Sequence, residues 1–268
     1  MPTITINGVA THYAEKGKPS ADTLLLLHGF PLNASMWTPQ LEALSARWRA
    51  IAPDFRGFGQ SAETGPFSIE QLADDTRALV EQLGLGKIVL AGLSMGGYVA
   101  LAYVRKYADT LRGLILLDTK AEPDTADGKV NRDRMIAIVN QKGAKPIADA
   151  MLPKLIPPEA IQHRPQIARA LRQMMETTRP ATIAHALAAM RDRPDLTGEL
   201  PQIALPTLTI VGEQDAITPP EVMRAMHEQI PRSQLKVITA SGHMTNLEQP
   251  SQVNVAMEHF LAELTPSM

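Results

Sequence analysis

Short apolar runs, separated by polar segments that contain glycine and proline, recur along the chain. In two of them, the Leu-Leu-Leu-Leu run at 24–27 and the Leu-Ile-Leu-Leu run at 114–117, every position is apolar. A continuous apolar run of this length is typical of a strand covered on both faces, as in a parallel sheet. The pattern predicts strands at 3–6, 9–14, 23–27, 50–52, 87–91, 113–117, 206–211 and 235–239.

Segments with helical periodicity lie between these strands. The stretch 68–84 has apolar residues on one side, opens with Ser68 and Gln71 in capping-box spacing, and stops at a glycine. Thr218 is predicted to cap a second helix that begins with a proline, and a last helix is predicted at about 250–264. Because strands alternate with helices, we expect an eight-stranded, mostly parallel α/β sheet with helices on both faces. The first two strands are expected to form an antiparallel hairpin at one edge.

The middle of the chain follows a different pattern. Between 119 and 205 there is no convincing strand, and helical stretches rich in Ala, Met, Arg and Leu are interrupted by prolines. Because proline ends or kinks a helix, we expect several short helices inserted between two strands. The predicted organisation is an α/β core built from residues 1–118 and 206–268, with a helical cap insertion at 119–205.

Composition and charge exclude several classes of protein. The 268 residues include 26 basic and 28 acidic side chains, and the net charge of −2 argues against nucleic acid as a partner. Without cysteine there is no disulfide framework, thiolate nucleophile or cysteine-based metal site. No apolar run approaches the roughly 18 to 20 residues that span a bilayer, and the N-terminus lacks a signal-peptide pattern. We expect a cytoplasmic protein with no membrane partner, no metal and no cofactor.

The strongest local motif is Gly-Leu-Ser-Met-Gly-Gly at 92–97, between a predicted strand and a helical run at 98–107. A G-x-S-x-G sequence in this setting forms a tight turn, in which side chains two positions either side of the serine would collide unless they were glycine. The turn sets the Ser94 hydroxyl at a helix N-terminus, where N–H groups favour developing negative charge. Ser94 is therefore the candidate nucleophile; a glycine-rich turn that merely carries a serine is the alternative.

A serine hydroxyl needs a base, and a histidine oriented by a carboxylate should follow later in the chain. Asp215 and His243 each come just after a predicted strand, at the edge where α/β sheets gather their functional residues. His243 would accept the Ser94 proton, and Asp215 would orient the imidazole. Asp118, which also ends a strand, is the rival acid, and Glu213 is a weaker candidate.

An oxyanion in such a site needs two N–H donors. One is expected from Met95, directly after the nucleophile, and the other from the loop His-Gly-Phe-Pro at 28–31. Because Pro31 has no N–H, Phe30 is the natural second donor, and His28 is expected to be structural.

The segment Asp-Phe-Arg-Gly-Phe-Gly-Gln-Ser at 54–61 also follows a predicted strand. It carries an acid, an arginine and a serine, which raises the question of a second site. We expect instead that Asp54, Arg56 and Ser61 hold a tight glycine-containing loop together by hydrogen bonds.

The chain resembles the α/β-hydrolase fold family in five ordered blocks, at 28–31, 54–61, 92–97, 212–219 and 241–250. The resemblance covers nearly the whole chain and implies Ser94, Asp215 and His243 as a catalytic triad, Phe30 and Met95 as the oxyanion hole, and the helical insertion as a cap. The blocks are most similar to those of bacterial carboxylesterases, and also to those of enol-lactonases and cofactor-free haloperoxidases or perhydrolases. Haloalkane dehalogenases and epoxide hydrolases carry Asp in place of the serine, so the resemblance does not extend to their chemistry.

The predicted cap contains no aromatic side chain, because no Phe, Tyr or Trp occurs between Tyr107 and Phe260. We therefore expect an adaptable aliphatic pocket for a small molecule. The candidate lining residues are Leu32, Met95, Ile217 and Met244, near the expected catalytic groups, and Met151 and Met190 in the cap.

These features predict a serine carboxylesterase that cleaves small or short-chain esters through an acyl-enzyme. An enol-lactonase with the same triad is the first alternative, and its carboxylate-bearing substrate would need arginines in the pocket. The cap arginines considered are Arg164, Arg169, Arg172, Arg179, Arg191 and Arg193. Perhydrolysis at the same acyl-enzyme is a further alternative, as is a non-enzymatic small-ligand receptor. The sequence leaves the oligomeric state open.

Overall fold

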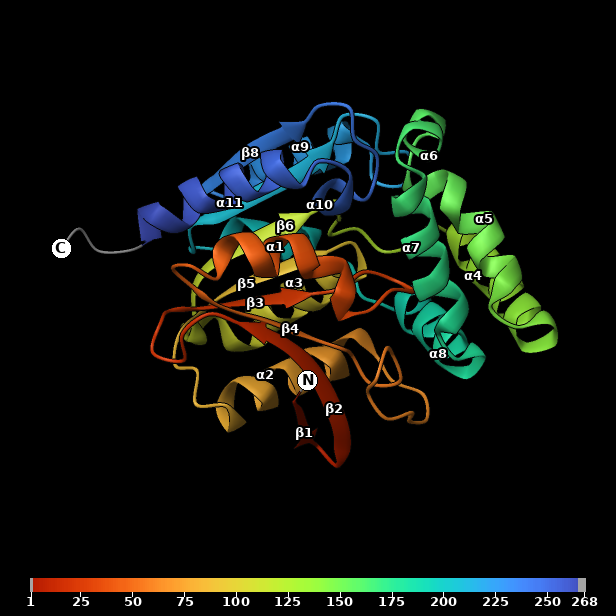
Figure 1. The fold of residues 1–268 in the computed structure, drawn as a ribbon, viewed down its shortest axis with the longest axis horizontal. Coiled ribbons are helices and arrows are strands. Elements are labelled where there is room, and N and C mark those ends of the chain that lie inside the picture. Colours follow the sequence, from red (N-terminus) through yellow and green to blue (C-terminus); the bar gives the residue numbers. More distant parts are fainter. Residues whose placement is uncertain (1, 265–268) are drawn as a thin grey trace.

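A computed structural model describes residues 2–264, which contain a single eight-stranded sheet with helices on both faces (Figure 1). The strands are β1 (Thr3–Ile6), β2 (Val9–Lys16), β3 (Thr23–Leu27), β4 (Arg49–Pro53), β5 (Ile88–Leu93), β6 (Leu111–Leu117), β7 (Thr207–Gly212) and β8 (Ser233–Ile238). The eight strands predicted from the apolar runs are confirmed. Residues 1 and 265–268 of the predicted core lie outside the described residues.

The strand order β1-β2-β4-β3-β5-β6-β7-β8 determines where the loops gather. β1 and β2 form the expected antiparallel edge hairpin, β2 is antiparallel to β4, and the remaining neighbours are parallel. Parallel strands place their carboxyl ends along one edge. The residues that follow β3 to β8 at this edge include His28, Asp54, Ser94, Asp118, Asp215 and His243.

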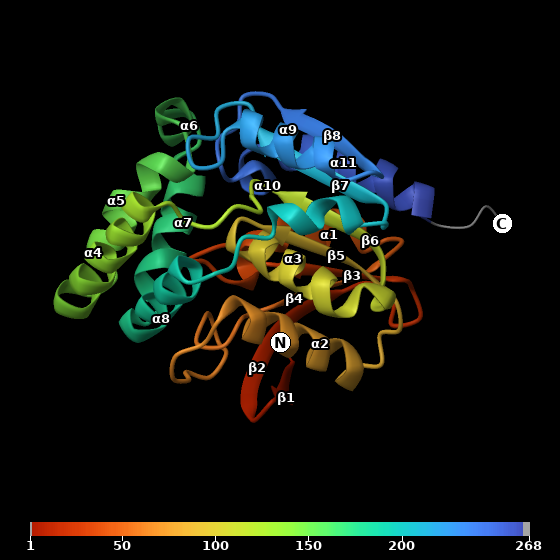
Figure 2. The same ribbon diagram turned by 180° about the vertical axis from the view of Figure 1, so that it is seen from behind.

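Two groups of helices cover the two faces of the sheet. Helices α1 (Thr38–Leu44) and α11 (Pro250–Leu264) lie in front in Figure 1, and α2 (Ile69–Gln82) and α3 (Met95–Tyr107) come to the front in Figure 2. Along β3, Leu24 and Leu26 pack into the cluster that includes α1 and α11, whereas Leu25 and Leu27 pack into the cluster that includes α2 and α3. Each such burial stabilises the fold by about 1.5–3 kcal/mol, which explains why every position of this strand is apolar.

Between β6 and β7 the chain forms only helices. They are α4 (Ala126–Lys142), α5 (Lys145–Leu155), α6 (Pro158–His163), α7 (Pro165–Thr177), α8 (Pro180–Arg191) and the 3-10 helix η3 (Thr197–Gln202). Helices α5 to α8 each have proline in the first or second position, where its fixed φ suits a helix start. In Figure 1 helices α4 to α8, which we call the α4–α8 segment, stand at the side to which the strand arrowheads point.

The shorter elements complete the chain: η1 (Ala34–Trp37), η2 (Ala108–Thr110), α9 (Pro220–Gln229) and α10 (Thr245–Glu248). The predicted cap of α2 is confirmed, because the Ser68 side chain accepts a hydrogen bond from the Gln71 N–H. The predicted Thr218 cap of α9 is wrong: the N-cap position is Pro219, because the Thr218 hydroxyl is committed to Asp215 at 2.7 Å. No helix within residues 2–264 is long and apolar enough to cross a membrane.

Candidate functional site

Ser94 lies between β5 and α3 in a backbone conformation that non-glycine residues rarely adopt, with φ 54° and ψ −113°. Such a conformation costs on the order of 1–3 kcal/mol and persists only where the surroundings fix it. Here the Ser94 N–H donates to the carbonyl of Leu117 at 2.9 Å, and the Ser94 carbonyl accepts from the Thr119 hydroxyl at 2.8 Å. The neighbouring strand β6 therefore holds the turn in place.

The glycines on either side of Ser94 are required by close backbone contacts. A Cβ atom at Gly92 would lie 2.2 Å from the carbonyl oxygen of Gly96, and a Cβ atom at Gly96 would lie 2.3 Å from the carbonyl oxygen of Leu27. Both distances are far shorter than a van der Waals contact, so only glycine fits. The motif thus has the spacing that the turn demands.

His243 and Asp215 are brought together by the loops after β8 and β7. His243 Nδ1 lies 2.8 Å from Asp215 Oδ2, and both side chains are buried. The same carboxylate accepts the N–H groups of Ile217 (2.8 Å) and Thr218 (3.0 Å) and the Thr218 hydroxyl (2.7 Å). Since a carboxylate only accepts, Nδ1 carries the proton and Nε2 is left to act as a base. Within residues 2–264 no hydrogen bond joins the Ser94 hydroxyl to His243, and such bonds often tighten only when substrate is bound.

The environment of Asp215 keeps it ionised. Burial works to raise the pKa of Asp215, but the adjacent His243 imidazole and the donors of Thr218 outweigh it and hold the pKa below its usual range. A charged carboxylate at this position would stabilise an imidazolium if His243 took up a proton.

The rival acid, Asp118, makes different contacts. Its carboxyl group accepts from the Gly212 N–H at 2.9 Å and from the Thr245 hydroxyl at 2.5 Å. Complete burial, followed by the nearby charge of Asp215, raises the pKa of Asp118 well above its usual range. The geometry therefore favours Asp215 as the partner of the imidazole.

Among the described residues, Glu213, the weaker candidate, likewise makes no hydrogen bond to the imidazole. Its carboxylate accepts the N–H of Ala240 at 3.3 Å in an exposed position.

The two expected oxyanion donors have free N–H groups. Among the described residues, no protein acceptor is paired with the backbone N–H of Phe30 or of Met95. The loop that carries Phe30 passes close to Ser94, because a Cβ at Gly29 would lie 3.6 Å from Ser94 Cβ. Met95 begins α3, a helix of 13 residues whose dipole adds positive potential at this end. Both N–H groups are available to an anionic oxygen.

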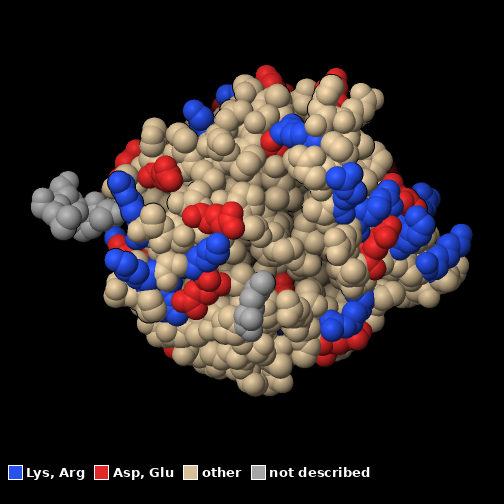
Figure 3. Space-filling model, in the orientation of Figure 1, with Lys and Arg blue, Asp and Glu red and all other residues tan. Residues whose placement is uncertain are grey.

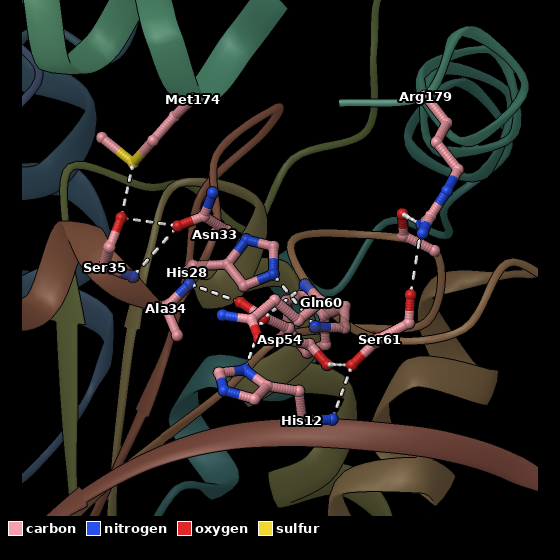
Figure 4. Close-up of polar contacts among 12 residues, drawn as sticks. His12, His28, Asn33, Ala34, Ser35, Asp54, Gln60, Ser61, Met174 and Arg179 are labelled. Carbon is pink, nitrogen blue, oxygen red and sulfur yellow. Dashed lines mark hydrogen bonds and ion pairs between the residues drawn. The ribbon is translucent and has the colours of Figure 1, made fainter. Parts of the chain in front are cut away.

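A buried hydrogen-bond network centred on Asp54 anchors the start of η1, directly after the loop that carries Phe30 (Figure 4). Asp54 Oδ1 accepts the N–H of Ala34 at 2.7 Å, while Oδ2 lies 2.8 Å from His12 Nδ1 and accepts the N–H of Gln60 at 2.9 Å. The Ser61 hydroxyl donates to the Asp54 carbonyl at 2.8 Å. Asp54 and Ser61 thus hold the loop as expected.

Arg56 and His28, which also belong to this region, make contacts outside the Asp54 network. Arg56 was expected to hold its own loop, but it forms an ion pair with Asp75 of α2 at 2.6 Å instead. A basic side chain gains more from a neighbouring carboxylate than from loop carbonyls. His28 is structural: its Nε2 accepts the Phe55 N–H at 3.1 Å, and burial lowers the pKa of His28.

The six expected pocket residues differ in burial. Leu32 and Met244 belong to one core cluster, and Met95 and Met190 to the other. Met151 is half-buried, whereas Ile217 is 37% exposed. A cavity of about 630 Å³ opens beside the Asp54 network, but none of the six lines it. Their role in a substrate pocket stays a prediction.

The arginines of the predicted cap, considered for a carboxylate-bearing substrate, mostly form hydrogen bonds or ion pairs with protein groups. Arg191 pairs with Asp133 at 2.5 Å and with Asp192 at 2.7 Å, and buried Arg193 pairs with Asp124 at 2.8 Å. Figure 3 shows basic side chains with acidic neighbours on this part of the surface. The other arginines of the group with hydrogen bonds to protein acceptors are Arg164, Arg172 and Arg179.

Three groups that hold the site were not predicted from the sequence. The Thr218 hydroxyl fixes Asp215, Glu248 accepts N–H groups on both sides of His243, and the carbonyl of Leu155 accepts the His243 N–H. An Asp side chain often accepts an N–H two residues on, as Asp215 does from Ile217, so a local turn signal existed near the first contact although it did not identify the Thr218 hydroxyl. The other two are contacts between distant segments and have no local signal.

Burial raises the pKa of Glu248 to about 7, although the N–H groups of Met244 and Gly242 and the charge of Arg164 oppose the shift. The folded state therefore binds more protons than the unfolded state between about pH 4.5 and 7. Stability from this residue is fully present below pH 4.5 and is lost as the pH rises through 7, a change of up to roughly 3 kcal/mol.

Glu248→Gln is expected to remove this part of the pH dependence, because glutamine keeps an acceptor but cannot ionise. The free energy of unfolding of the variant, relative to the wild type, should rise from pH 5 to pH 8 in urea titrations. Glu258→Gln, the same substitution at an exposed position of α11, is the control and should show no such trend. A constant difference between Glu248→Gln and the wild type across this range would contradict the assignment.

Among the described residues, no group of three or more His, Asp or Glu side chains is placed to hold a metal ion.

Comparison with known proteins shows that nearly the whole chain is similar to hydrolases of one family. A model of the alpha/beta hydrolase family matches residues 24–256. The structure of a thermophilic esterase from Thermogutta terrifontis is 42% identical, with a TM-score of 0.94 over 98% of each chain. An enol-lactonase from Burkholderia xenovorans is 28% identical, with a TM-score of 0.91 over 97% of this chain and 100% of that chain. The 3-oxoadipate enol-lactonase 2 of Acinetobacter baylyi is 29% identical over 257 residues, 96% of this chain and 94% of that protein.

Proposed function

Because the chain belongs to the alpha/beta hydrolase family, we propose that it is a serine carboxylesterase that cleaves small or short-chain esters through an acyl-enzyme. Ser94 is the nucleophile, His243 the general base and acid, and Asp215 the group that orients the imidazole. The observation that carries the proposal is the 2.8 Å contact between His243 Nδ1 and Asp215 Oδ2, in a chain whose strained Ser94 directly precedes helix α3.

The reaction divides into two transfers at Ser94. In the first, the Ser94 oxygen attacks the ester carbonyl while His243 Nε2 takes its proton, and the N–H groups of Phe30 and Met95 stabilise the oxyanion. Collapse of this intermediate breaks the ester bond, and His243 returns the proton to the leaving alcohol. In the second, water gives its proton to His243 and attacks the acyl-enzyme, which releases the carboxylic acid and restores Ser94.

The helices between β6 and β7 fit the role of a cap over this site. They reach the core through the Thr178 hydroxyl, which donates to the Pro31 carbonyl at 3.0 Å, and through Arg179, which donates to the Gly57 carbonyl at 2.8 Å. The first contact adjoins the loop of the oxyanion donor Phe30. Substrate enclosed here would meet aliphatic and methionine side chains, which favours an apolar acyl group.

Enol-lactone hydrolysis is the second candidate, since two of the relatives are enol-lactonases. Against it, Arg191 and Arg193 are paired with acidic side chains and offer no free cation for a substrate carboxylate. The sequence identity to the thermophilic esterase is also higher than that to either enol-lactonase, which supports an ester as the substrate.

A panel of p-nitrophenyl esters from acetate to dodecanoate, measured beside an enol-lactone that carries a carboxylate, separates the two candidates. We expect the highest kcat/KM among the short acyl chains, because methionine and leucine side chains make a compact apolar pocket. Sustained turnover beyond one equivalent per chain would distinguish an enzyme from a receptor. A kcat/KM for the lactone that exceeds every ester would contradict the proposal in favour of the lactonase.

A further inference from the structure

The main chain of His243 is bound directly by the α4–α8 segment. The His243 N–H donates to the carbonyl oxygen of Leu155 at 3.0 Å, and Leu155 is the last residue of α5. The final carbonyls of a helix have no partner within the helix and are free to accept from elsewhere. The end of α5 thus supplies an acceptor to the residue that carries the imidazole.

The segment that makes this contact is buried and lies close to the backbone of residue 242. Leu155 and Ile156 are each 1% exposed, so water has little access to replace the bond. A Cβ at Gly242 would lie 2.7 Å from Pro157 Cδ and 3.2 Å from the Leu155 carbonyl oxygen. Residues 155–157, which we call the elbow, therefore pack against the backbone on which His243 sits.

The neighbouring N–H groups are held from the other side. Glu248 Oε1 accepts the N–H of Gly242 at 2.9 Å and that of Met244 at 3.2 Å. Three consecutive N–H groups are thus fixed, the outer two by Glu248 in the core and the middle one by the elbow. A second link crosses the same boundary, because Arg164 Nη1 donates to the Glu248 carbonyl. Removing the elbow would leave only the middle N–H, that of His243, without its acceptor.

We propose that the elbow at 155–157 is a positioning element for His243, so that the imidazole is aligned only while this part of the cap is docked on the core. The inference rests on the proposed function and deepens it. Docking of the cap then does two things at once: it encloses the substrate and it sets the base. A displaced elbow would lower kcat, whereas a cap that only shaped the pocket would change mainly KM.

The test introduces a steric conflict at the elbow and then removes it. Gly242→Ala places a methyl group against Pro157 Cδ, and we expect kcat to fall by about 10- to 100-fold with KM changed less than about threefold. Pro157→Ala removes Cδ, the one atom that would lie closer than 3.0 Å to the new Cβ. The remaining contacts, 3.2 Å to the Leu155 carbonyl oxygen and 3.3 Å to Glu248 Oε1, need only small shifts, so the double variant should recover to within about threefold of Pro157→Ala alone. Gly198→Ala, in η3, is the control for the same substitution, because a Cβ there meets nothing within 4 Å.

A readout that needs no substrate is the low-field proton resonance of the His243 Nδ1–H, which is bonded to Asp215. It should shift or broaden in Gly242→Ala and return in the double variant. If the wild-type chain turned over no ester, the proposed function would fail, yet this resonance would still report on the elbow. The two failures are therefore distinguishable.

Two outcomes would overturn the proposal. One is a Gly242→Ala variant with unchanged kcat and resonance, and the other is a loss that Pro157→Ala does not relieve, since the effect would then be local to position 242. If Gly242→Ala does not fold, Arg164→Met carries the test, because it removes the second link without adding bulk. It should lower kcat severalfold and broaden the resonance, and unchanged values in this variant would likewise overturn the proposal.

Discussion

Ser94→Ala is expected to lower kcat/KM for a short-chain ester by about 10⁴-fold or more, because alanine provides no oxygen to form the acyl-enzyme. The loss should come without unfolding. Within residues 2–264 the Ser94 side chain has no hydrogen-bond partner in the protein, so its removal leaves no buried group unpaired. The measurement is steady-state hydrolysis beside a thermal unfolding curve.

The control for this variant is Ser45→Ala, at the end of α1 and far along the chain from the site. It should retain wild-type turnover. Residual activity in Ser94→Ala above one per cent of the wild type, with the fold intact, would mean that another group performs the attack.

Asp215→Asn is expected to lower kcat by about 10⁴-fold with little change in KM. An asparagine amide facing His243 Nδ1 would donate rather than accept, so the imidazole would carry its proton on Nε2 and lose its function as a base. The volume of the side chain is nearly unchanged, which separates this electronic effect from a packing defect.

Asp118→Asn is the matched control, because Asp118 is buried nearby and its contacts run to Gly212 and Thr245. Its raised pKa favours a neutral side chain, which asparagine imitates. We expect less than about a tenfold loss of kcat. The reverse ranking, with Asp118→Asn the more damaging change, would identify Asp118 as the acid of the triad.

The sheet was predictable because its signal is local. Runs such as 24–27 are apolar at every position for a reason visible in the structure, namely that alternate residues pack against helices on opposite faces. The turn at Ser94 was predictable for the same reason, since Gly92 and Gly96 avoid clashes within a few residues of chain. Patterns of this kind involve residues that are close together in the sequence, so they can be recognised without knowledge of the fold.

The expectations that failed involve side chains with a choice of partner. Threonine is a common N-cap residue, yet the Thr218 hydroxyl donates to Asp215 instead of capping the helix. Arg56 forms an ion pair with Asp75 of α2 instead of a hydrogen bond within its own loop. Each expectation followed from the residue type and its immediate neighbours in the sequence alone. In both cases the side chain bonds a carboxylate, and hydrogen bonds to charged groups are stronger than those to neutral ones.

Contacts between distant segments were beyond the reach of the sequence. Leu155 and His243 are far apart in the chain, and a carbonyl acceptor leaves no mark on residue type. The carboxyl of Glu248 likewise binds N–H groups, which every residue but proline provides. The substrate pocket belongs to the same class, because its shape depends on how the α4–α8 segment rests on the core.

The central claim, that Ser94 is a nucleophile activated by His243, is tested most directly by intact-mass and peptide analysis after exposure to a fluorophosphonate. A serine without an activating base does not react with such a reagent at an appreciable rate. We predict one phosphonyl group per chain, located on the peptide that contains Ser94, and no labelling of Ser94→Ala. An unlabelled wild-type chain, or a label on a different residue, would contradict the account.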